Sequence, residues 1–225
     1  MGNMLRKVLP TRLLAPYRLH RRFLAMKAVD EQLCSTAEEL DPDLLEGAEL
    51  LPNRLSLIER MPKNAVVAEV GVSTGDYSAK LLQFSQPAKL YLIDLWSYSP
   101  SAKYGEQALM TVKSKFASEI QSGVVEIRRG PSWEQLDALT EDSVDWVYID
   151  AGHDYESCRR DLESAHRVVR PGGFICGHDY TNWLNINRMG VVDAVNKFCN
   201  QHRYRMRYLT NQYNRHLSYG LTLSE

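Results

Sequence analysis

Val66-Val67-Ala68-Glu69-Val70-Gly71-Val72-Ser73-Thr74-Gly75-Asp76 reads as an apolar strand that runs into a turn of small residues. A helix from Tyr77 to Leu82 follows directly. Glycine lets the backbone turn sharply and lie close to a ligand, because no Cβ is in the way. The start of the helix offers N–H groups that have no partner within the helix. The stretch therefore predicts a strand, a ligand-binding turn and a helix.

A second apolar strand, Lys89-Leu90-Tyr91-Leu92-Ile93-Asp94, ends in a carboxylate. Asp94 lies 23 residues after Gly71. That spacing is close to the ~20 residues at which an acid at a strand end reaches a ribose hydroxyl in βαβ nucleotide sites. The two strands together predict a cofactor that contains a nucleoside.

The glycine pattern distinguishes between two classes of cofactor. The dinucleotide pattern Gly-x-Gly-x-x-Gly would need glycine where this chain has Ser73 and Asp76. An aspartate at the third position would also repel a pyrophosphate. The spacing Glu69-x-Gly71-x-Ser73-x-Gly75 instead resembles the first motif of class I S-adenosylmethionine-dependent methyltransferases, with Ser73 as the only departure. A glycine turn in another kind of α/β protein stays open as an alternative.

Size and composition are those of an ordinary globular protein. The chain has 225 residues, of which 44% are hydrophobic and 24% charged, and no apolar run approaches the ~20 residues of a membrane span. Its four cysteines are scattered and form no C-x-x-C pair, which indicates neither a zinc ribbon nor a disulfide framework. We expect a cytoplasmic protein with one main domain and an extension.

The N-terminal segment is strongly basic. Residues 1–29 contain seven lysines and arginines and no acid, so the remaining residues carry a net charge of −8. A basic arm with interspersed apolar residues predicts contact with an anionic membrane surface or with a partner subunit. Pro10 and Pro16 argue against one continuous helix from the N-terminus, so we expect a helix from about Tyr17. The acidic body disfavours binding to nucleic acid.

From Ala65 onward, apolar strands and amphipathic helices alternate. The pattern predicts an α/β, Rossmann-like doubly wound sheet, mostly parallel and seven-stranded, with a C-terminal antiparallel hairpin. We assign residues 1–60 to the basic arm and short helices, and residues 61–225 to the main domain. The expected strands are 65–70, 89–94, 124–128, 144–149 and 173–177, the expected helices 75–84, 103–120, 133–139, 155–169 and 189–200, and the hairpin segments 204–209 and 217–223.

Titratable residues gather at the carboxyl ends of the later strands. Asp150 ends the strand Val144-Asp145-Trp146-Val147-Tyr148-Ile149, and His153 follows three residues later. His178 and Asp179 come directly after the next strand. Ligands of such sheets bind at this edge, where the strand order reverses. The group could therefore hold a divalent cation or act as a general base.

A more specific resemblance covers roughly residues 64–223. Ile149-Asp150-x-x-His153-x-Tyr155, then Pro171-Gly172-Gly173, then Gly177-His178-Asp179-Tyr180 resembles the small-molecule O-methyltransferase branch of the class I methyltransferases. That branch includes macrocin-type sugar O-methyltransferases, with catechol O-methyltransferases as more distant relatives.

The resemblance implies roles for individual residues. Asp150, His178 and Asp179 would hold magnesium or manganese, although His178 stands where the pattern has a carboxylate, and magnesium prefers oxygen ligands. His153, Asp150 and His178 would be catalytic, with His153 as the base. Trp96 or Trp133 could cover the purine, and Glu69 would orient the methionine ammonium group. The cofactor-binding residues would be Glu69, Gly71, Val72, Ser73, Gly75, Asp94 and Leu95 near the methionine and ribose, Ser132 and Trp133 at the adenine, and Asp150.

The sequence thus predicts an S-adenosylmethionine-dependent methyltransferase that acts on a hydroxyl of a small molecule or sugar. A homo-oligomer is one assembly that the chain could form. A non-catalytic cofactor-binding or scaffold protein of the same fold is the first alternative. A nicotinamide-dependent oxidoreductase is the second, weakened by the missing glycines.

Overall fold

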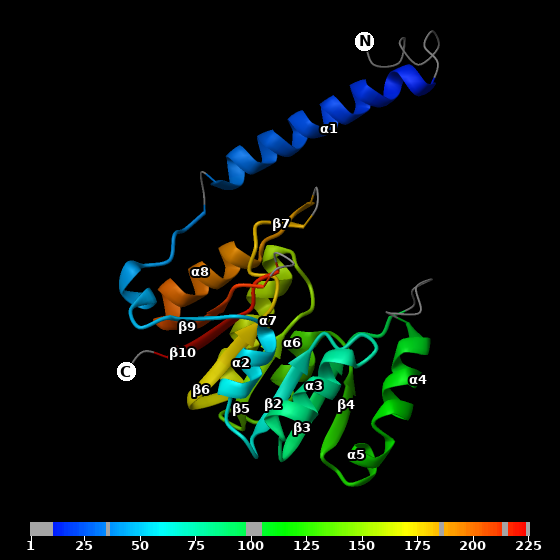
Figure 1. Cartoon of the computed structure of the whole chain (residues 1–225), viewed down its shortest axis with the longest axis vertical. Coiled ribbons are helices and arrows are strands. Elements are labelled where there is room, and N and C mark those ends of the chain that lie inside the picture. Colours follow the sequence, from blue (N-terminus) through cyan, green and yellow to red (C-terminus); the bar gives the residue numbers. More distant parts are fainter. Residues whose placement is uncertain (1–10, 35–36, 98–104, 185–186, 213–215, 224–225) are drawn as a thin grey trace. The chain divides into compact units, whose positions relative to one another are not determined.

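The computed structural model describes residues 11–34, 37–97, 105–184, 187–212 and 216–223 (Figure 1). The chain divides into two compact units. One contains residues 1–38 and 183–188, and the other contains residues 39–182 and 189–225. The second unit holds the sheet, and residues 39–60 belong to it as well.

The sheet of the second unit runs in the order β1-β9-β10-β6-β5-β2-β3-β4. All neighbours are parallel except β10, which is antiparallel to both β6 and β9. The order reverses between β2 and β5, which places the switch point of the doubly wound fold there. The strand bounds are β1 Glu49–Leu51, β2 Val66–Val70, β3 Lys89–Asp94, β4 Val125–Arg129, β5 Val144–Ile149, β6 Val169–Gly177, β9 Tyr204–Thr210 and β10 Tyr219–Leu223.

The fold class and the C-terminal hairpin are confirmed, but the predicted count of seven strands is wrong. The eighth strand of this sheet is β1, which pairs in parallel with β9 through Glu49, Leu50 and Leu51. Three residues are too few for a periodic pattern to show, and the segment lies between Pro42 and Pro52. The segment is a strand only because it pairs with β9, where the partner of Glu49 is Tyr208, 159 residues later in the sequence.

Helices cover both faces of the sheet, with α2 and α3 on one face and α6 and α7 on the other (Figure 1). The predicted helix over 103–120 is two helices, because the backbone leaves helical geometry at Phe116. Residues 42–62 hold a 3₁₀ helix, a strand and one short helix. The bounds are η2 Pro42–Leu45, α2 Arg54–Arg60, α3 Asp76–Ser85, α4 Glu106–Lys115, α5 Ala117–Gln121, α6 Ser132–Asp137, α7 Tyr155–Val168 and α8 Val191–His202.

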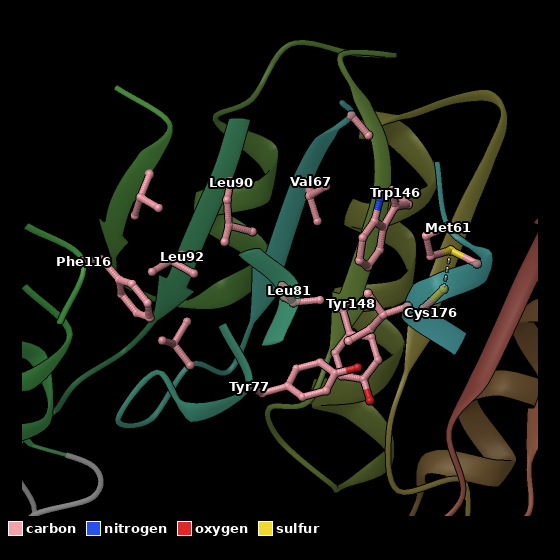
Figure 2. Packing of buried hydrophobic residues seen from close by; sticks show 14 of the residues in the cluster. Met61, Val67, Tyr77, Leu81, Leu90, Leu92, Phe116, Trp146, Tyr148 and Cys176 are labelled. Carbon is pink, nitrogen blue, oxygen red and sulfur yellow. Dashed lines mark hydrogen bonds between the residues drawn. The ribbon is translucent and has the colours of Figure 1, made fainter. Parts of the chain in front are cut away.

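A continuous apolar core joins α2, α3 and α4 to the sheet (Figure 2). Alternate residues of a strand point to the same face, so Val67, Leu90, Leu92, Trp146 and Tyr148 all contribute to this cluster. All five of these side chains are fully buried. Burial of this size holds the strands in register and so fixes the edge at which β2, β3, β4 and β5 end.

The first unit contains α1, Thr11–Cys34, and an antiparallel pair of short strands, β7 Trp183–Leu184 and β8 Asn187–Arg188. The helix begins at Thr11 and includes Pro16, so the expected start near Tyr17 is wrong. Pro16 removes one hydrogen bond close to the N-terminal end, and the helix continues for more than four turns beyond it. Among the described residues, no helix has the length and apolar character needed to cross a bilayer.

Candidate active site

The glycine turn after β2 packs directly against the end of β5. Gly71 N–H donates to the Ile93 carbonyl at 2.9 Å, and Asp150 N–H donates to the Val70 carbonyl at 2.7 Å. Gly71 has a φ of +89°, and a Cβ at this position would lie 2.0 Å from the Asp150 carbonyl oxygen. Only glycine satisfies both the conformation and the close approach. The turn therefore lies at the switch point of the sheet, as predicted.

Ser73, the departure from the glycine pattern, has the backbone conformation that glycine usually supplies. Its φ is +55°, in the left-handed region. Its carbonyl accepts a hydrogen bond of 3.0 Å from the indole of Trp96. Trp96 is fully buried and also has a positive φ, of +38°. Its indole thus braces the turn from within the core.

Asp94 holds the turn together from the end of β3. Its Oδ2 accepts hydrogen bonds from the N–H groups of Val72 and Ser73, each 2.8 Å long. Its Oδ1 accepts a third, from the N–H of Trp96 at 2.9 Å. A carboxylate oxygen can accept two hydrogen bonds, so Oδ1 retains capacity for one more donor. That capacity is where a ribose hydroxyl could bind.

A pocket of about 450 Å³ opens at this edge of the sheet. Its size falls in the range of small-molecule sites. Seven of the predicted cofactor-binding residues line it, together with two residues of α7, Ser157 and Asp161, that no sequence motif indicated. The lining residues are Gly71, Ser73, Ile93, Asp94, Leu95, Trp96, Ser97, Pro131, Ser132, Trp133, Asp150, Ala151, Gly152, Ser157 and Asp161.

The other three predicted cofactor residues are not part of that lining. Val72 is a buried core residue. Gly75 precedes α3 with a φ of +75°, and a Cβ there would lie 2.7 Å from the Phe116 ring. Glu69 is 1% exposed, and burial raises the pKa of its carboxyl group to about 8. Its Oε2 has no hydrogen-bond partner within the described part of the chain.

The later strands bring histidines and carboxylates together, and Asp179 lies between two of the histidines. Its Oδ2 lies 2.9 Å from Nε2 of His153, and its Oδ1 contacts Nδ1 of His216. Although burial raises the pKa of Asp179, its hydrogen bonds and the nearby imidazoles outweigh that effect and lower the pKa to about 2. The hydrogen bond to Asp179 in turn raises the pKa of His153. Asp179 is thus an ionised acceptor that orients both imidazoles.

His178, predicted to be catalytic and a metal ligand, has a different set of contacts. Its Nδ1 lies 2.9 Å from the hydroxyl of Ser218, which also lies 3.2 Å from the hydroxyl of Tyr148. Its Nε2 lies 4.0 Å from Asp179. Burial lowers the pKa of His178 to about 4, so the ring is neutral at pH 7. These contacts connect β5, β6 and the start of β10.

Asp150 lies between the pocket and the histidine cluster. Burial, followed by repulsion from Asp179, raises its pKa to about 6, and Arg54 partly offsets both effects. Nη1 of Arg54 lies 3.5 Å from Asp150 Oδ2, and its guanidinium group lies 4.4 Å from the centre of the Tyr77 ring. Sequence reasoning missed both Arg54 and His216, because neither belongs to a motif. Only their positions in the fold bring them here.

Among the residues that the structure describes, two groups have the composition and spacing to hold a metal ion. One is Asp150, His153 and Asp179, and the other is His178, Asp179 and His216. In each group the ligand atoms lie within 4.8 Å of one another. The predicted set of Asp150, His178 and Asp179 is divided between them. Both groups include nitrogen donors, which suit manganese or another transition metal better than magnesium.

The chain was also compared with known protein families. A family described as a methyltransferase domain matches residues 68–180. The chain belongs to this methyltransferase family. The matched region begins in β2 and ends just after Asp179, so it contains the glycine turn and most of the histidine–aspartate cluster. No sequence among the curated proteins matches the chain.

Solved structures share the fold at low sequence identity. A SAM-dependent methyltransferase from Aquifex aeolicus is 15% identical, with a TM-score of 0.53 over 82% of this chain and 94% of that one. The M1A22 tRNA methyltransferase of B. subtilis is 11% identical, with a TM-score of 0.55 over 78% and 67% of the two chains. An O-methyltransferase family protein from Burkholderia thailandensis is 12% identical, with a TM-score of 0.53 over 76% and 55%.

These likenesses establish the class I S-adenosylmethionine-dependent methyltransferase fold. They favour the methyltransferase prediction over the nicotinamide-dependent alternative. S-adenosylmethionine is accordingly the cofactor expected for the pocket at the switch point. The neighbours include enzymes whose names refer to tRNA as well as to O-methylation, so fold alone does not identify the acceptor.

Proposed function

We propose that this methyltransferase transfers a methyl group to a hydroxyl of a small molecule or sugar. The observation that carries the proposal is the pair formed by His153 and Asp179 at the same sheet edge as the glycine turn. The side chain of His153 is 40% exposed, whereas that of Asp179 is 9% exposed. An imidazole that is held by a buried carboxylate and is itself partly exposed suits proton removal from an acceptor.

The pocket residues support a cofactor position next to this pair. Asp94 would accept a ribose hydroxyl at Oδ1, while Ser132 and Trp133 would contact the adenine. Glu69 would interact with the positively charged methionine end, which would relieve its unpartnered oxygen. Asp150 lines the pocket and also lies among the histidines, so it would lie between the cofactor and the acceptor.

The chemistry follows from these positions. S-adenosylmethionine supplies a methyl group on a sulfonium, and transfer leaves a neutral thioether. His153 would accept the proton of the acceptor hydroxyl as that oxygen takes the methyl group from the sulfonium. Asp179 stabilises the resulting imidazolium. Positioning of the acceptor should provide most of the rate gain, with proton removal adding about 10²–10⁴-fold.

A divalent cation bound by Asp150, His153 and Asp179 is the second candidate, favoured by the spacing of their ligand atoms. A cation there would lower the pKa of the acceptor hydroxyl. It would also occupy His153, so the same imidazole could not act as the base. The donor set fits a metal such as manganese, and metal dependence therefore distinguishes the two versions of the site.

The acidic body of the protein supports a small acceptor. Residues 30–225 carry a net charge of −8, which would repel a polyanion such as RNA. The proposed acceptor is thus a small molecule, whereas the name of the B. subtilis neighbour refers to tRNA.

A panel assay tests the proposed function. Metal-stripped protein is incubated with S-adenosylmethionine and catechols, simple phenols or sugars, with and without manganese or magnesium, and methylated products are detected by mass spectrometry. We expect turnover of at least one hydroxyl compound. His153→Gln should lower the rate by about 10²–10⁴-fold while cofactor binding, measured by calorimetry, is retained.

His202→Gln is the matched control, because His202 pairs with Glu163 on α7 and is not among the lining residues. Full activity in His153→Gln would refute the base assignment. Cofactor binding with no turnover of any hydroxyl compound would favour the scaffold alternative. Turnover that requires the metal would favour the second candidate.

A further inference from the structure

Asp161 is a buried carboxylate in the wall of the cofactor pocket that none of the roles above uses. It lies on α7, one helical turn after Ser157, and both residues line the pocket. Residues four apart on a helix share a face, so these two side chains form one polar strip on α7. Pro131, Ser132 and Trp133, at the start of α6, also line the pocket. Asp161 therefore lies where α6 and α7 enclose the pocket.

The carboxylate lacks the partners that a buried charge needs. Asp161 is 1% exposed, and neither oxygen has a hydrogen bond of normal geometry to any described residue. Burial raises the pKa of Asp161 to about 6, although the side chain of Ser132 lowers it in part. At pH 7 the group is still mostly ionised. A buried, ionised acceptor without a donor is costly, which points to a ligand that supplies the donor.

The chemistry of the cofactor identifies that donor. In the proposed function a ribose hydroxyl binds at Asp94, which also lines the pocket. The remaining hydrogen-bond donor of an adenosine is the 6-amino group of its purine. We propose that Asp161 accepts a hydrogen bond from this amino group and thereby selects an adenine over other purines. The inference rests on the proposed use of S-adenosylmethionine.

The proposal requires a small movement in the pocket wall. The oxygens of Asp161 are almost fully covered, so a ligand reaches them only if a neighbouring side chain rotates. Ser132 is only half-buried, and its interaction with Asp161 identifies it as the group that turns aside. Hydroxyl side chains exchange rotamers readily, and the bound amino group would replace the interaction that is lost.

Binding of two ligands to matched variants tests the proposal. The ligands are S-adenosylhomocysteine and its analogue in which hydrogen replaces the 6-amino group, and dissociation constants are measured by calorimetry at pH 7.5. We expect the native protein to prefer S-adenosylhomocysteine by about 10- to 100-fold, as for a hydrogen bond to a charged group. In Asp161→Leu, which keeps the branched shape of the side chain but removes both acceptor oxygens, this preference should disappear while the affinity for the analogue is unchanged.

Two further variants complete the test. Asp161→Asn keeps one acceptor oxygen and should retain part of the preference. Ser164→Ala alters a buried polar residue of the same helix that is not among the lining residues, and it should keep the full preference. Equal affinity of the native protein for the two ligands, or an equal loss for both ligands in Asp161→Leu, would overturn the proposal. Failure of the native protein to bind S-adenosylhomocysteine at all would instead overturn the cofactor assignment.

Discussion

Glu69 is held in an environment that suits a neutral carboxyl group, whereas the proposed function would bring the positively charged methionine end of the cofactor near it. Burial is the largest influence on its pKa, and the carboxylates of Asp150 and Asp94 raise it further, to about 8. Ser78 and Arg54 oppose this shift. At pH 7 Glu69 is therefore mostly protonated. An ammonium group brought near it would favour the ionised form.

We predict that cofactor binding at pH 7 releases about one proton from Glu69, because the pKa of about 8 must fall when the cation arrives. Below pH 8 the carboxyl group of Glu69 is mostly protonated, and it must lose this proton before it can pair with the ammonium group. The affinity for the cofactor should therefore fall as the pH is lowered. Calorimetry in two buffers of different ionisation enthalpy measures the release.

Glu69→Gln should abolish that release and flatten the dependence of affinity on pH. Asp76→Asn is the control, since Asp76 is an exposed acid at the start of the helix that follows the same turn. Binding heats of the native protein that do not differ between buffers would show that Glu69 remains in one protonation state.

At the scale of elements, the site depends on how closely the turn after β2 approaches the end of β5. Gly71 provides both a positive φ and the space for the Asp150 carbonyl oxygen. Gly123, at the tight turn before β4, also has a positive φ, of +81°, but a Cβ there would meet nothing within 4 Å. The two glycines therefore separate the effect of backbone conformation from that of close packing.

Gly71→Ala should destabilise the protein by more than about 3 kcal/mol, because backbone strain and a clash with backbone atoms add together. Gly123→Ala should lower the free energy of unfolding by only about 1–2 kcal/mol, because alanine is strained in the left-handed conformation but meets no other atom there. Urea denaturation of both variants measures the difference. Costs of similar size would mean that the β2–β5 approach can relax, and that the turn is less rigid than its geometry indicates.

At the scale of the whole molecule, the pocket is built within one compact unit. Its lining residues all lie between Gly71 and Asp161, and that range belongs to the unit of residues 39–182 and 189–225. The basic helix α1 belongs to the other unit, where Leu19 and Phe23 are exposed. Cofactor binding should therefore not depend on α1.

A chain that begins at Glu39 should fold and bind S-adenosylhomocysteine with unchanged affinity, because no lining residue is removed. Circular dichroism and calorimetry, in parallel with the full chain, measure both properties. A variant that begins at Met61, and so lacks β1 and α2, serves as the comparison and should not fold, since both elements pack in the core unit. Loss of affinity in the longer variant would contradict the division into units.

The sequence by itself determined the strands of the main sheet from Val66 onward, the glycine turn and the carboxyl-end clustering of Asp150, His153, His178 and Asp179. These features have local causes, namely apolar periodicity, the conformational freedom of glycine and the common edge of parallel strands. Only the tertiary structure decided which of these groups touch. His216 reaches the site from the segment before β10, Arg54 from the start of α2, and Asp161 through the packing of α7 beside the pocket. Long-range contacts of this kind leave no pattern in neighbouring residues, so sequence reasoning could not find them.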